Sequence, residues 1–340
     1  MKNKVLEIVK QNVGIDVSKD KIDVTFSELD AFFDDFVVAS RKFANTPKGF
    51  IELQGWVNSK KRPNMAVHFT MEATGVYYEA LAYFLYQQED YRVHVVLPNK
   101  AYKYGQSLGL RSSTDKIDAR MLSLMGLKQT LRLWLPISPS LLVLRQLTRE
   151  RIALVQNRTN VSNQLHAYKH QGKPNKETIA RTEKHISFLD SQINQIEKDI
   201  KKFVDMDNEL KNKMKFLLSI KGAGMVTATT IVAETNGFAA FESIKQVVGF
   251  AGLDVRIAES GKWKGKSKIS KRGNSYIRSV LYMPTLSKIR HDKATKQAYE
   301  RLKEKKGVGM IAVVAQMRKM LAMMYTLWKK QEMFKDISAI

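Results

Sequence analysis

The chain contains no cysteine among its 340 residues, and this absence excludes several kinds of site. A chain without thiols has no disulfides, no zinc site built on cysteine ligands and no thiol nucleophile. It also has no apolar run near the roughly 20 residues that a membrane span requires. The apolar core of residues 1–14 is too short for a signal peptide. We therefore expect a cytosolic protein with no membrane partner.

Acidic residues are also scarce, because 33 aspartates and glutamates stand against 57 lysines and arginines and leave a formal charge of +24. Charge of one sign on this scale costs self-repulsion and indicates a polyanionic partner. Nucleic acid is the first candidate and an anionic membrane surface the second. The length allows about two domains, and an apolar fraction of 44% is ordinary for a protein with real cores.

Four of the few carboxylates lie at unusual places. Asp16 lies inside an apolar, strand-like run, and Glu72 ends another. Asp115 and Asp118 lie three residues apart at the start of a helical pattern, so they share one face of the helix. A carboxylate within a strand is costly unless it meets a cation. We expect the four to converge on one or two divalent ions such as Mg²⁺, which prefers oxygen ligands of this type.

The region from residue 11 to about 135 alternates between strand and helix patterns. Strands are expected around 12–18, 22–26 and 36–43, with a turn at Lys19–Lys21. Thr46-Pro47 is typical of a helix start, with a capping side chain followed by proline. An antiparallel meander followed by strand–helix units predicts an α/β domain, in which helices flank a mixed sheet.

Two further elements are expected in this region. The strand that ends at Glu72 precedes Thr74, which we interpret as the cap of a helix through Leu81 and Leu85. The run YRVHVVLP, residues 91–98, is typical of a buried strand.

The pattern changes between about 138 and 205, where apolar residues follow heptad spacing. This spacing predicts two long helices packed as an antiparallel coiled-coil hairpin, interrupted at 171–175 by a cluster of helix breakers. Each arm is on the order of 45 Å long, and the coiled coil indicates at least a dimer. Arg151 and Arg158 lie beside the apolar stripe, either as surface residues that bury their stems or as contacts to nucleic-acid phosphates.

The remainder, from about 210, is mostly helical and carries two candidate nucleic-acid contacts. Gly222 and Gly224 form a turn between two helical runs, similar to the hairpins that bind phosphate through backbone amides, although plain helix connections share this form. Basic residues then gather around Trp263 and Tyr276, which favours a nucleic-acid contact over a solvated loop. They are Lys262, Lys264, Lys266, Lys268, Lys271, Arg272 and Arg278.

Four motifs in order resemble one family: GIDVSKDKIDV, MEATGVYYEAL, STDKIDA and GFAGLDVRIAESGKWKGKSKISKRGNSYIR. They are similar to the DEDD transposases of insertion sequences, serine-dependent recombinases guided by a structured bridge RNA. The resemblance covers residues 11 to about 325. It implies a ribonuclease-H-like (RuvC-like) domain at 1–137, a coiled-coil hairpin at 138–208 and a helical transposase domain at 209–340, in the bacterial cytosol and nucleoid.

The resemblance also implies roles for individual residues. Asp16, Glu72, Asp115 and Asp118 take the places of the family's metal-binding catalytic carboxylates, and Ser260 takes the place of its nucleophile. The implied partners are donor and target DNA, a guide RNA and further copies of the chain, as a dimer and, by analogy, a tetramer. The implied reaction is cutting and rejoining of DNA through a transient phosphoserine link.

Several other residues are weaker candidates for the site. Ser275 is a weaker candidate for the nucleophile, because its spacing fits a helix. Asp20 and Asp23 are expected to be a turn and a strand-surface carboxylate. His166 and His170 have the four-residue spacing of metal ligands, but without a third ligand nearby we expect them to be solvated.

Two other functions stay open from the residues alone. A metal-dependent junction resolvase or nuclease would use the same carboxylates with water, and would not need Ser260. A scaffolding protein for nucleic acid would need none of the four carboxylates. Asp16 argues against the scaffold, because clustered negative charge beside nucleic acid benefits only an enzyme.

Overall fold

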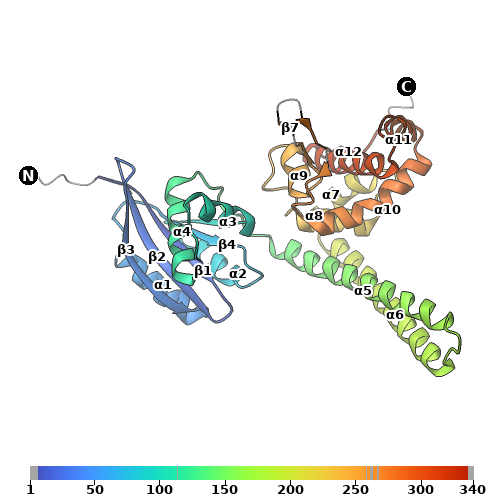
Figure 1. Ribbon diagram of the computed structural model, residues 1–340, viewed down its shortest axis with the longest axis horizontal. Coiled ribbons are helices and arrows are strands. Elements are labelled where there is room, and N and C mark those ends of the chain that lie inside the picture. Colours follow the sequence, from blue (N-terminus) through green and yellow to red (C-terminus); the bar gives the residue numbers. More distant parts are fainter. Residues whose placement is uncertain (1–6, 113, 258, 261–262, 266–267, 336–340) are drawn as a thin grey trace, which may run out of the picture. The chain divides into compact units, whose positions relative to one another are not determined.

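The chain forms two compact units, Met1–Pro136 and Ile137–Ile340. The computed structural model describes residues 7–112, 114–257, 259–260, 263–265 and 268–335 (Figure 1). The first boundary lies within a residue of the one expected from the sequence. The hairpin and the C-terminal helices, expected as separate domains, belong to one compact unit.

The first unit is built on a five-stranded mixed sheet in the order β3-β2-β1-β4-β5. β1 pairs antiparallel with β2, and β2 with β3, whereas β1, β4 and β5 run parallel. The strands are β1 Ile8–Val17, β2 Lys21–Asp30, β3 Asp35–Ala44, β4 Val67–Glu72 and β5 Tyr91–Val96. The helices are α1 Pro47–Asn58, α2 Glu79–Tyr86, α3 Pro98–Ser107 and α4 Asp115–Lys128. The expected mixed α/β fold is therefore confirmed.

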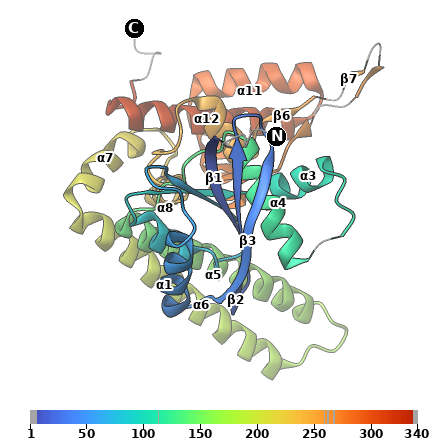
Figure 2. The ribbon, with the colours of Figure 1, turned by 90° about the vertical axis from the view of Figure 1, so that its left-hand side faces the viewer.

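Helices cover both faces of this sheet. Alternation along β1 directs Val13, Ile15 and Val17 into a core with side chains of α1 and α2, such as Leu53 and Leu85. The other face of β1 packs against α4. Figure 2 shows α1 and α4 on opposite sides of the strands.

α4 lies unusually close to β1, because glycine stands at the points of contact. A Cβ atom on Gly14 would lie 2.1 Å from the carbonyl oxygen of Ala119 and from the backbone nitrogen of Ser123. Gly126 of α4 approaches Asn12 and Thr70 in the same way. The Asn12 amide donates to the Ser123 carbonyl at 2.8 Å, so polar contacts fix the helix at this distance.

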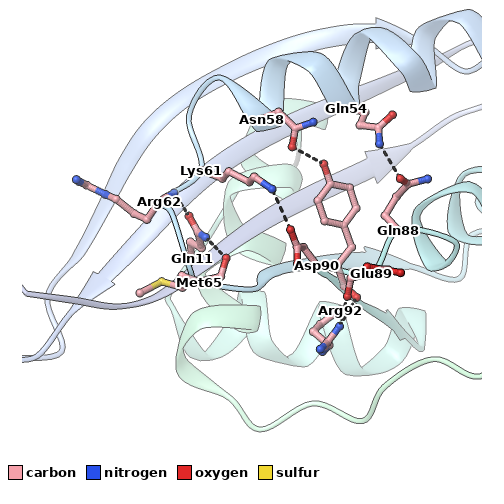
Figure 3. A network of polar contacts seen from close by, with 11 residues as sticks. Gln11, Gln54, Asn58, Lys61, Arg62, Met65, Gln88, Glu89, Asp90 and Arg92 are labelled. Carbon is pink, nitrogen blue, oxygen red and sulfur yellow. Dashed lines mark hydrogen bonds and ion pairs between the residues drawn. The ribbon is translucent and has the colours of Figure 1, made fainter.

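Polar contacts close the end of the sheet at which β4 and β5 begin (Figure 3). Lys61 pairs with Asp90 at 3.2 Å, and the Gln54 amide donates to Gln88 at 2.7 Å. Gln11 of β1 donates to the Met65 carbonyl at 2.8 Å. The candidate site lies at the opposite end of the sheet, where β4 ends at Glu72.

Most local expectations in this unit are confirmed, and one is wrong. Thr46 caps α1 and accepts from the Gly49 amide at 3.2 Å, with Pro47 in the first turn. Thr74 does not cap a helix: α2 begins only at Glu79, and the Thr74 hydroxyl donates to the Glu72 carboxylate at 3.0 Å instead. The Thr74 hydroxyl therefore bonds a side chain two residues away and not the backbone of a helix.

The second unit is almost entirely helical among its described residues. Its helices are α5 Pro139–Lys169, α6 Lys176–Met206, α7 Asn208–Leu218, α8 Met225–Glu234, α9 Ile244–Phe250, α10 Ser275–His291, α11 Lys293–Lys306 and α12 Gly309–Lys330. Short strands between α9 and α10 form two small pairs: β6 Val255–Arg256 with β9 Lys268–Ile269, and β7 Glu259–Ser260 with β8 Trp263–Lys264. No helix in the described part of the chain is long and apolar enough to cross a membrane.

α5 and α6 form an antiparallel hairpin held by ion pairs. Lys169 pairs with Glu183 at 2.7 Å near the tip. The pairs Arg158–Asp190 and Arg151–Glu197, both at 2.7 Å, lie progressively farther from it. The root of the hairpin joins the core of the second unit, because Leu144 of α5 and Ile200 of α6 belong to the same cluster as Phe238 and Trp328.

The close approach of α4 predicts the effect of a single methyl group. Gly14→Ala should destabilise the first unit by about 3 kcal/mol, because the added Cβ meets backbone atoms that can move only with the helix. Calorimetry of the full chain is the measurement. Gly55→Ala is the matched control, because its Cβ meets nothing within 4 Å, and it should stabilise by up to about 1 kcal/mol. Equal behaviour of the two variants would contradict the close contact.

Candidate functional site

Three carboxylates form a row across neighbouring strands. Asp16 of β1 lies directly opposite Asp23 of β2 in the antiparallel register. Ile15 pairs with Met71 of β4, so the next residues along, Asp16 and Glu72, are also neighbours. Side chains at paired positions point to the same face of a sheet. Asp23, Asp16 and Glu72 therefore share the face that α4 covers.

Two more carboxylates come from the first turn of α4. Thr114 caps the helix by accepting from the Ile117 amide at 3.3 Å, and Asp115 and Asp118 follow in the first turn. Negative side chains are favourable there, because the helix dipole is positive at its N-terminus. The close packing of α4 on β1 at Gly14 brings this turn toward the strand row.

Electrostatics shows that the five carboxylates form one cluster. Burial, together with the charges of Asp118, Asp115, Glu72 and Asp23, raises the pKa of Asp16 from 3.8 to about 6. A carboxyl group with four negative neighbours keeps its proton to a higher pH than usual, and a bound cation would favour its ionised form. The structure thus brings together all four carboxylates selected from the sequence, and adds Asp23.

Lysines and a hydroxyl already contact three members of the cluster. Lys21 Nζ lies 2.5 Å from Asp115 Oδ2, and this hydrogen bond lowers the pKa of the Asp115 carboxyl. Lys42 Nζ lies 3.1 Å from Asp23 Oδ1. Glu72 accepts from the Thr74 hydroxyl.

The donor set fits a hard divalent cation, since it consists of carboxylate oxygens only. Asp16, Glu72, Asp115 and Asp118 would hold such an ion, with Asp23 beside them. Within the described residues, no three acidic or histidine side chains are already placed as a metal site. To hold an ion, side chains of the cluster would therefore have to turn toward it.

Ser260 lies in the second unit, on a β arm that we define as residues 255–269. It ends β7 and pairs with Trp263, and its side chain is exposed. Lys268 of β9, also exposed, belongs to the pair of strands nearest the base of the arm. The sequence predicts a nucleic-acid contact here, with a solvated loop as the alternative, and the described residues form two short paired segments.

The base of the arm is held by a dense set of polar contacts. Arg278 Nη1 donates to the carbonyls of Ala251, Gly273 and Asn274 at 2.8, 3.1 and 3.3 Å. The Ser270 hydroxyl donates to Asp254 at 2.5 Å, which ties the two ends of the arm together. The arm that carries Ser260 therefore leaves the helical core from a fixed base.

A buried glutamate connects this base to the hairpin. Glu234 of α8 accepts two hydrogen bonds from Arg149 of α5, at 2.6 and 2.9 Å. It accepts a third, at 2.6 Å, from the amide of Asn274, which also caps α10. Arg149 in turn stacks over the ring of Tyr276 at 4.6 Å. The sequence offered no signal for this network beyond an acid at the end of an apolar helix.

The residues predicted to bind nucleic acid have different surroundings. Arg151 and Arg158 are paired with acids of α6, so the structure gives them a role within the hairpin. Gly222 has a φ of +88° and packs against the Pro284 carbonyl of α10, and Gly224 precedes α8. Their contacts with nucleic acid stay predictions.

The basic residues near Ser260 are described only in part. Lys268, Lys271 and Arg272 are exposed, and Arg278 is half-buried. Lys262 and Lys266 lie outside the described residues, as does the side chain of Lys264. A nucleic-acid contact by this group is likewise still a prediction.

Asp23, Lys21 and Lys42 are the members of the site that sequence reasoning missed. We expected Asp23 to be a strand-surface carboxylate, but it is only 4% exposed. A signal was present, because a turn at 18–20 pairs Val17 with Ile22 and so Asp16 with Asp23. Lys42 lies on the next strand, opposite Asp23 in the register.

Two family models match the chain. A transposase model of the DEDD type matches residues 13–171, and a model described as "Transposase IS116/IS110/IS902 family" matches residues 214–300. The chain therefore belongs to the DEDD-type insertion-sequence transposases, which are enzymes that act on DNA. The resemblance drawn from the motifs is confirmed, and a scaffold without enzymatic activity is not supported. Membership in the family also supports the use of a divalent metal ion.

Two relatives match almost the whole chain, and a third matches about a third of it. A "Pilin gene-inverting protein" of Moraxella bovis is 27% identical over 331 residues, covering 96% of this chain and 98% of the relative. A protein of the same name from Moraxella lacunata is 28% identical over the same shares. A "Probable family 20 transposase" of Pseudomonas aeruginosa is 26% identical over 108 residues, 32% of this chain and 31% of the relative.

The raised pKa of Asp16 predicts a pH-dependent effect of its removal. The folded protein binds the Asp16 proton more tightly than the unfolded chain, so stability falls as pH rises from about 4 to about 6. Asp16→Asn should therefore stabilise the metal-free protein at pH 8, by about 1 kcal/mol after allowance for solvent screening, and not at pH 4.

Thermal unfolding in a chelating buffer between pH 4 and pH 8 measures this difference. Asp20→Asn, in the exposed turn nearby, is the control and should show no such pH dependence. The stability difference between Asp16→Asn and the unsubstituted protein could instead stay constant over this pH range. That result would show that Asp16 is not part of a repulsive cluster.

Proposed function

We propose that this chain is a recombinase that cuts and rejoins donor and target DNA, guided by a structured RNA, with Ser260 as the nucleophile. The observation that carries the proposal is the cluster of five carboxylates from β1, β2, β4 and the first turn of α4. Gathering such charges destabilises the fold, so the cluster indicates a function. Phosphoryl transfer, which uses metal ions held by carboxylates, is a chemistry that needs it. The strand order and directions of the sheet also support a ribonuclease-H-like (RuvC-like) domain.

The carboxylates would hold Mg²⁺, with Asp16 central and Glu72, Asp115 and Asp118 around it. The ion, when bound, neutralises charge on the phosphate and stabilises the attacking and leaving oxygens. The chain's own contribution is to orient these oxygen ligands, since β1 and β4 fix two of them and α4 fixes two more. Asp16, half-buried and surrounded by acids, is the group that most needs the cation.

Ser260 would supply the covalent step. Its Oγ attacks a backbone phosphorus, so one P–O bond to serine forms as the P–O bond to a deoxyribose oxygen breaks. The serine proton passes to a base, and the departing oxygen takes up a proton. The number of phosphodiester bonds is unchanged, so a second DNA end can reverse the step without an external energy source. Hydrolysis would lose this bond.

The structure supports an arm that presents this serine, because Ser260 is exposed on short paired strands with a fixed base. The acids and the serine belong to different compact units, so the reaction requires a serine of the same chain or of another copy to reach the acids. The family implies DNA substrates and assembly into oligomers. A dimer or tetramer would let one copy serve another.

Guidance by RNA rests on the family resemblance and on the strong positive charge of the chain. Pairing with a guide would carry the target sequence, so side chains need not read bases. The relatives named for pilin gene inversion fit the same chemistry, because inversion also cuts and rejoins strands.

Removal of the Ser260 hydroxyl tests the covalent step. The protein is incubated with RNA transcribed from the DNA beside its gene, with donor and target DNA and with Mg²⁺. Ser260→Ala should abolish the protein–DNA adduct and lower recombination by on the order of 10³-fold or more, while RNA binding persists. Asp16→Asn should lose product in the same way, with the fold retained.

Ser275→Ala is the control, because Ser275 is another exposed serine of the basic region. It should form adduct and product normally. Undiminished recombination by Ser260→Ala would remove the serine from the mechanism, and DNA cleavage without adduct would favour the resolvase or nuclease reading.

A further inference from the structure

Lysines surround the Asp23 side of the carboxylate row. Lys21 Nζ lies 2.5 Å from Asp115 Oδ2 and 4.0 Å from Asp23 Oδ2, so it bridges α4 and β2. Lys42 of β3 contacts the other oxygen of Asp23 at 3.1 Å. The catalytic chemistry described above uses neither lysine. Both are held by their strand positions within reach of the cluster.

A pocket of about 200 Å³ opens between α4 and strands β2 and β3, and Lys42 is one of its lining residues, whereas Lys21 contacts Asp23 of that lining from the start of β2. Its lining includes Asp23, Lys42 and Lys116, together with Thr25 and Ser40. The hydroxyls of Thr25 and Ser40 lie 3.0 Å apart. Ammonium and hydroxyl groups are the donors that proteins use to hold backbone phosphates. Asp23 does not repel an anion here as a free carboxylate would, because Lys42 is paired with it.

The site would otherwise face two conflicts. A nucleic-acid strand must approach five carboxylates, which repel it, and Asp115 must turn to a metal ion while Lys21 holds it. Both partners of the Lys21–Asp115 pair are nearly half exposed, at 47% and 46%. An exposed ion pair of this kind contributes only about 0–1 kcal/mol, so exchange of its partner costs little. A phosphate arriving beside Lys21 would offer the lysine another anion.

We propose that Lys21, Lys42 and Lys116 form a binding site for a backbone phosphate of the nucleic-acid substrate, and that Lys21 leaves Asp115 when this phosphate binds. The proposal rests on the proposed function, because it places the phosphate next to the metal-binding carboxylates. It adds an order of assembly: the substrate frees Asp115 for the metal, so DNA and metal strengthen each other's binding. Before DNA binds, Lys21 keeps the cluster partly neutralised and weakly metal-binding.

Linkage makes the coupling measurable. If DNA tightens metal binding by some factor, metal must tighten DNA binding by the same factor. Isothermal titration with Mn²⁺, at fixed ionic strength, gives the metal affinity of the full chain with and without a short DNA duplex. DNA should tighten Mn²⁺ binding of the unsubstituted protein by about 10-fold, within the usual range of such couplings.

Lys21→Gln should uncouple the two ligands. Without DNA it should bind Mn²⁺ more tightly than the unsubstituted protein, because Asp115 is already free, and DNA should add about twofold or less. Lys19→Gln is the matched control, since it removes the same charge two residues away from an exposed turn. It should keep the affinity and coupling of the unsubstituted protein. Equal coupling in the two variants, or equal Mn²⁺ affinity without DNA, would overturn the proposal.

Two further readouts separate this proposal from the proposed function. Lys116→Gln should weaken binding of duplex DNA, measured by fluorescence anisotropy without metal, more than Lys19→Gln does. Equal losses would remove the phosphate site. If the four carboxylates do not form the metal site, Asp16→Asn should bind Mn²⁺ as tightly as the unsubstituted protein does. This result would contradict the proposed function and is distinct from a loss of coupling.

Discussion

The close approach of α4 to β1 is the constraint on which the candidate site depends. Five carboxylates within reach of one another repel, and nothing in their own chemistry would keep them together. Gly14 and Gly126 leave room for the helix against the sheet, and Asn12 fixes it there through the Ser123 carbonyl. The contact points on α4 begin at Ala119, the residue next to Asp118, and reach Gly126, about three turns from Asp115. The packing free energy of the helix therefore offsets the repulsion that the acids create. The pKa of Asp16 is raised first by burial and then by this repulsion.

Much of this arrangement could be predicted from residue patterns. Alternation placed Asp16 on the polar face of a strand, Thr46-Pro47 located a helix start, and the spacing of Asp115 and Asp118 placed both on one turn. The patterns did not predict the register between neighbouring strands, or which of two partners a side chain bonds. The sequence predicts Asp23 on the surface of a strand. Only the pairing of β2 with β1 shows that Asp23 is buried and lies beside Asp16. The sequence predicts that Thr74 caps a helix, but that helix begins five residues later, because the Thr74 hydroxyl bonds the neighbouring Glu72 carboxylate instead.

The second unit shows a similar division between pattern and context. Heptad spacing and the breaker cluster at 171–175 predicted the two arms of the hairpin, which α5 and α6 form. Their arginines looked available to phosphate, yet Arg151 and Arg158 pair with acids across the hairpin. The Glu234 network also depends on contacts 40 and 85 residues apart. It connects the hairpin to the base of the arm that carries Ser260, so a displacement of the hairpin can be transmitted to that arm through these hydrogen bonds.

Iron-directed cleavage tests most directly whether acids from distant segments form one metal site. Fe²⁺ bound in place of Mg²⁺ generates radicals with peroxide that cut the backbone close to the ion, and the cuts can be mapped along the full chain. The cluster predicts cuts near residues 16, 72 and 115 together, suppressed by excess Mg²⁺ and absent in Asp16→Asn. Cuts confined to one of these segments, or unchanged in Asp16→Asn, would show that the carboxylates do not share an ion.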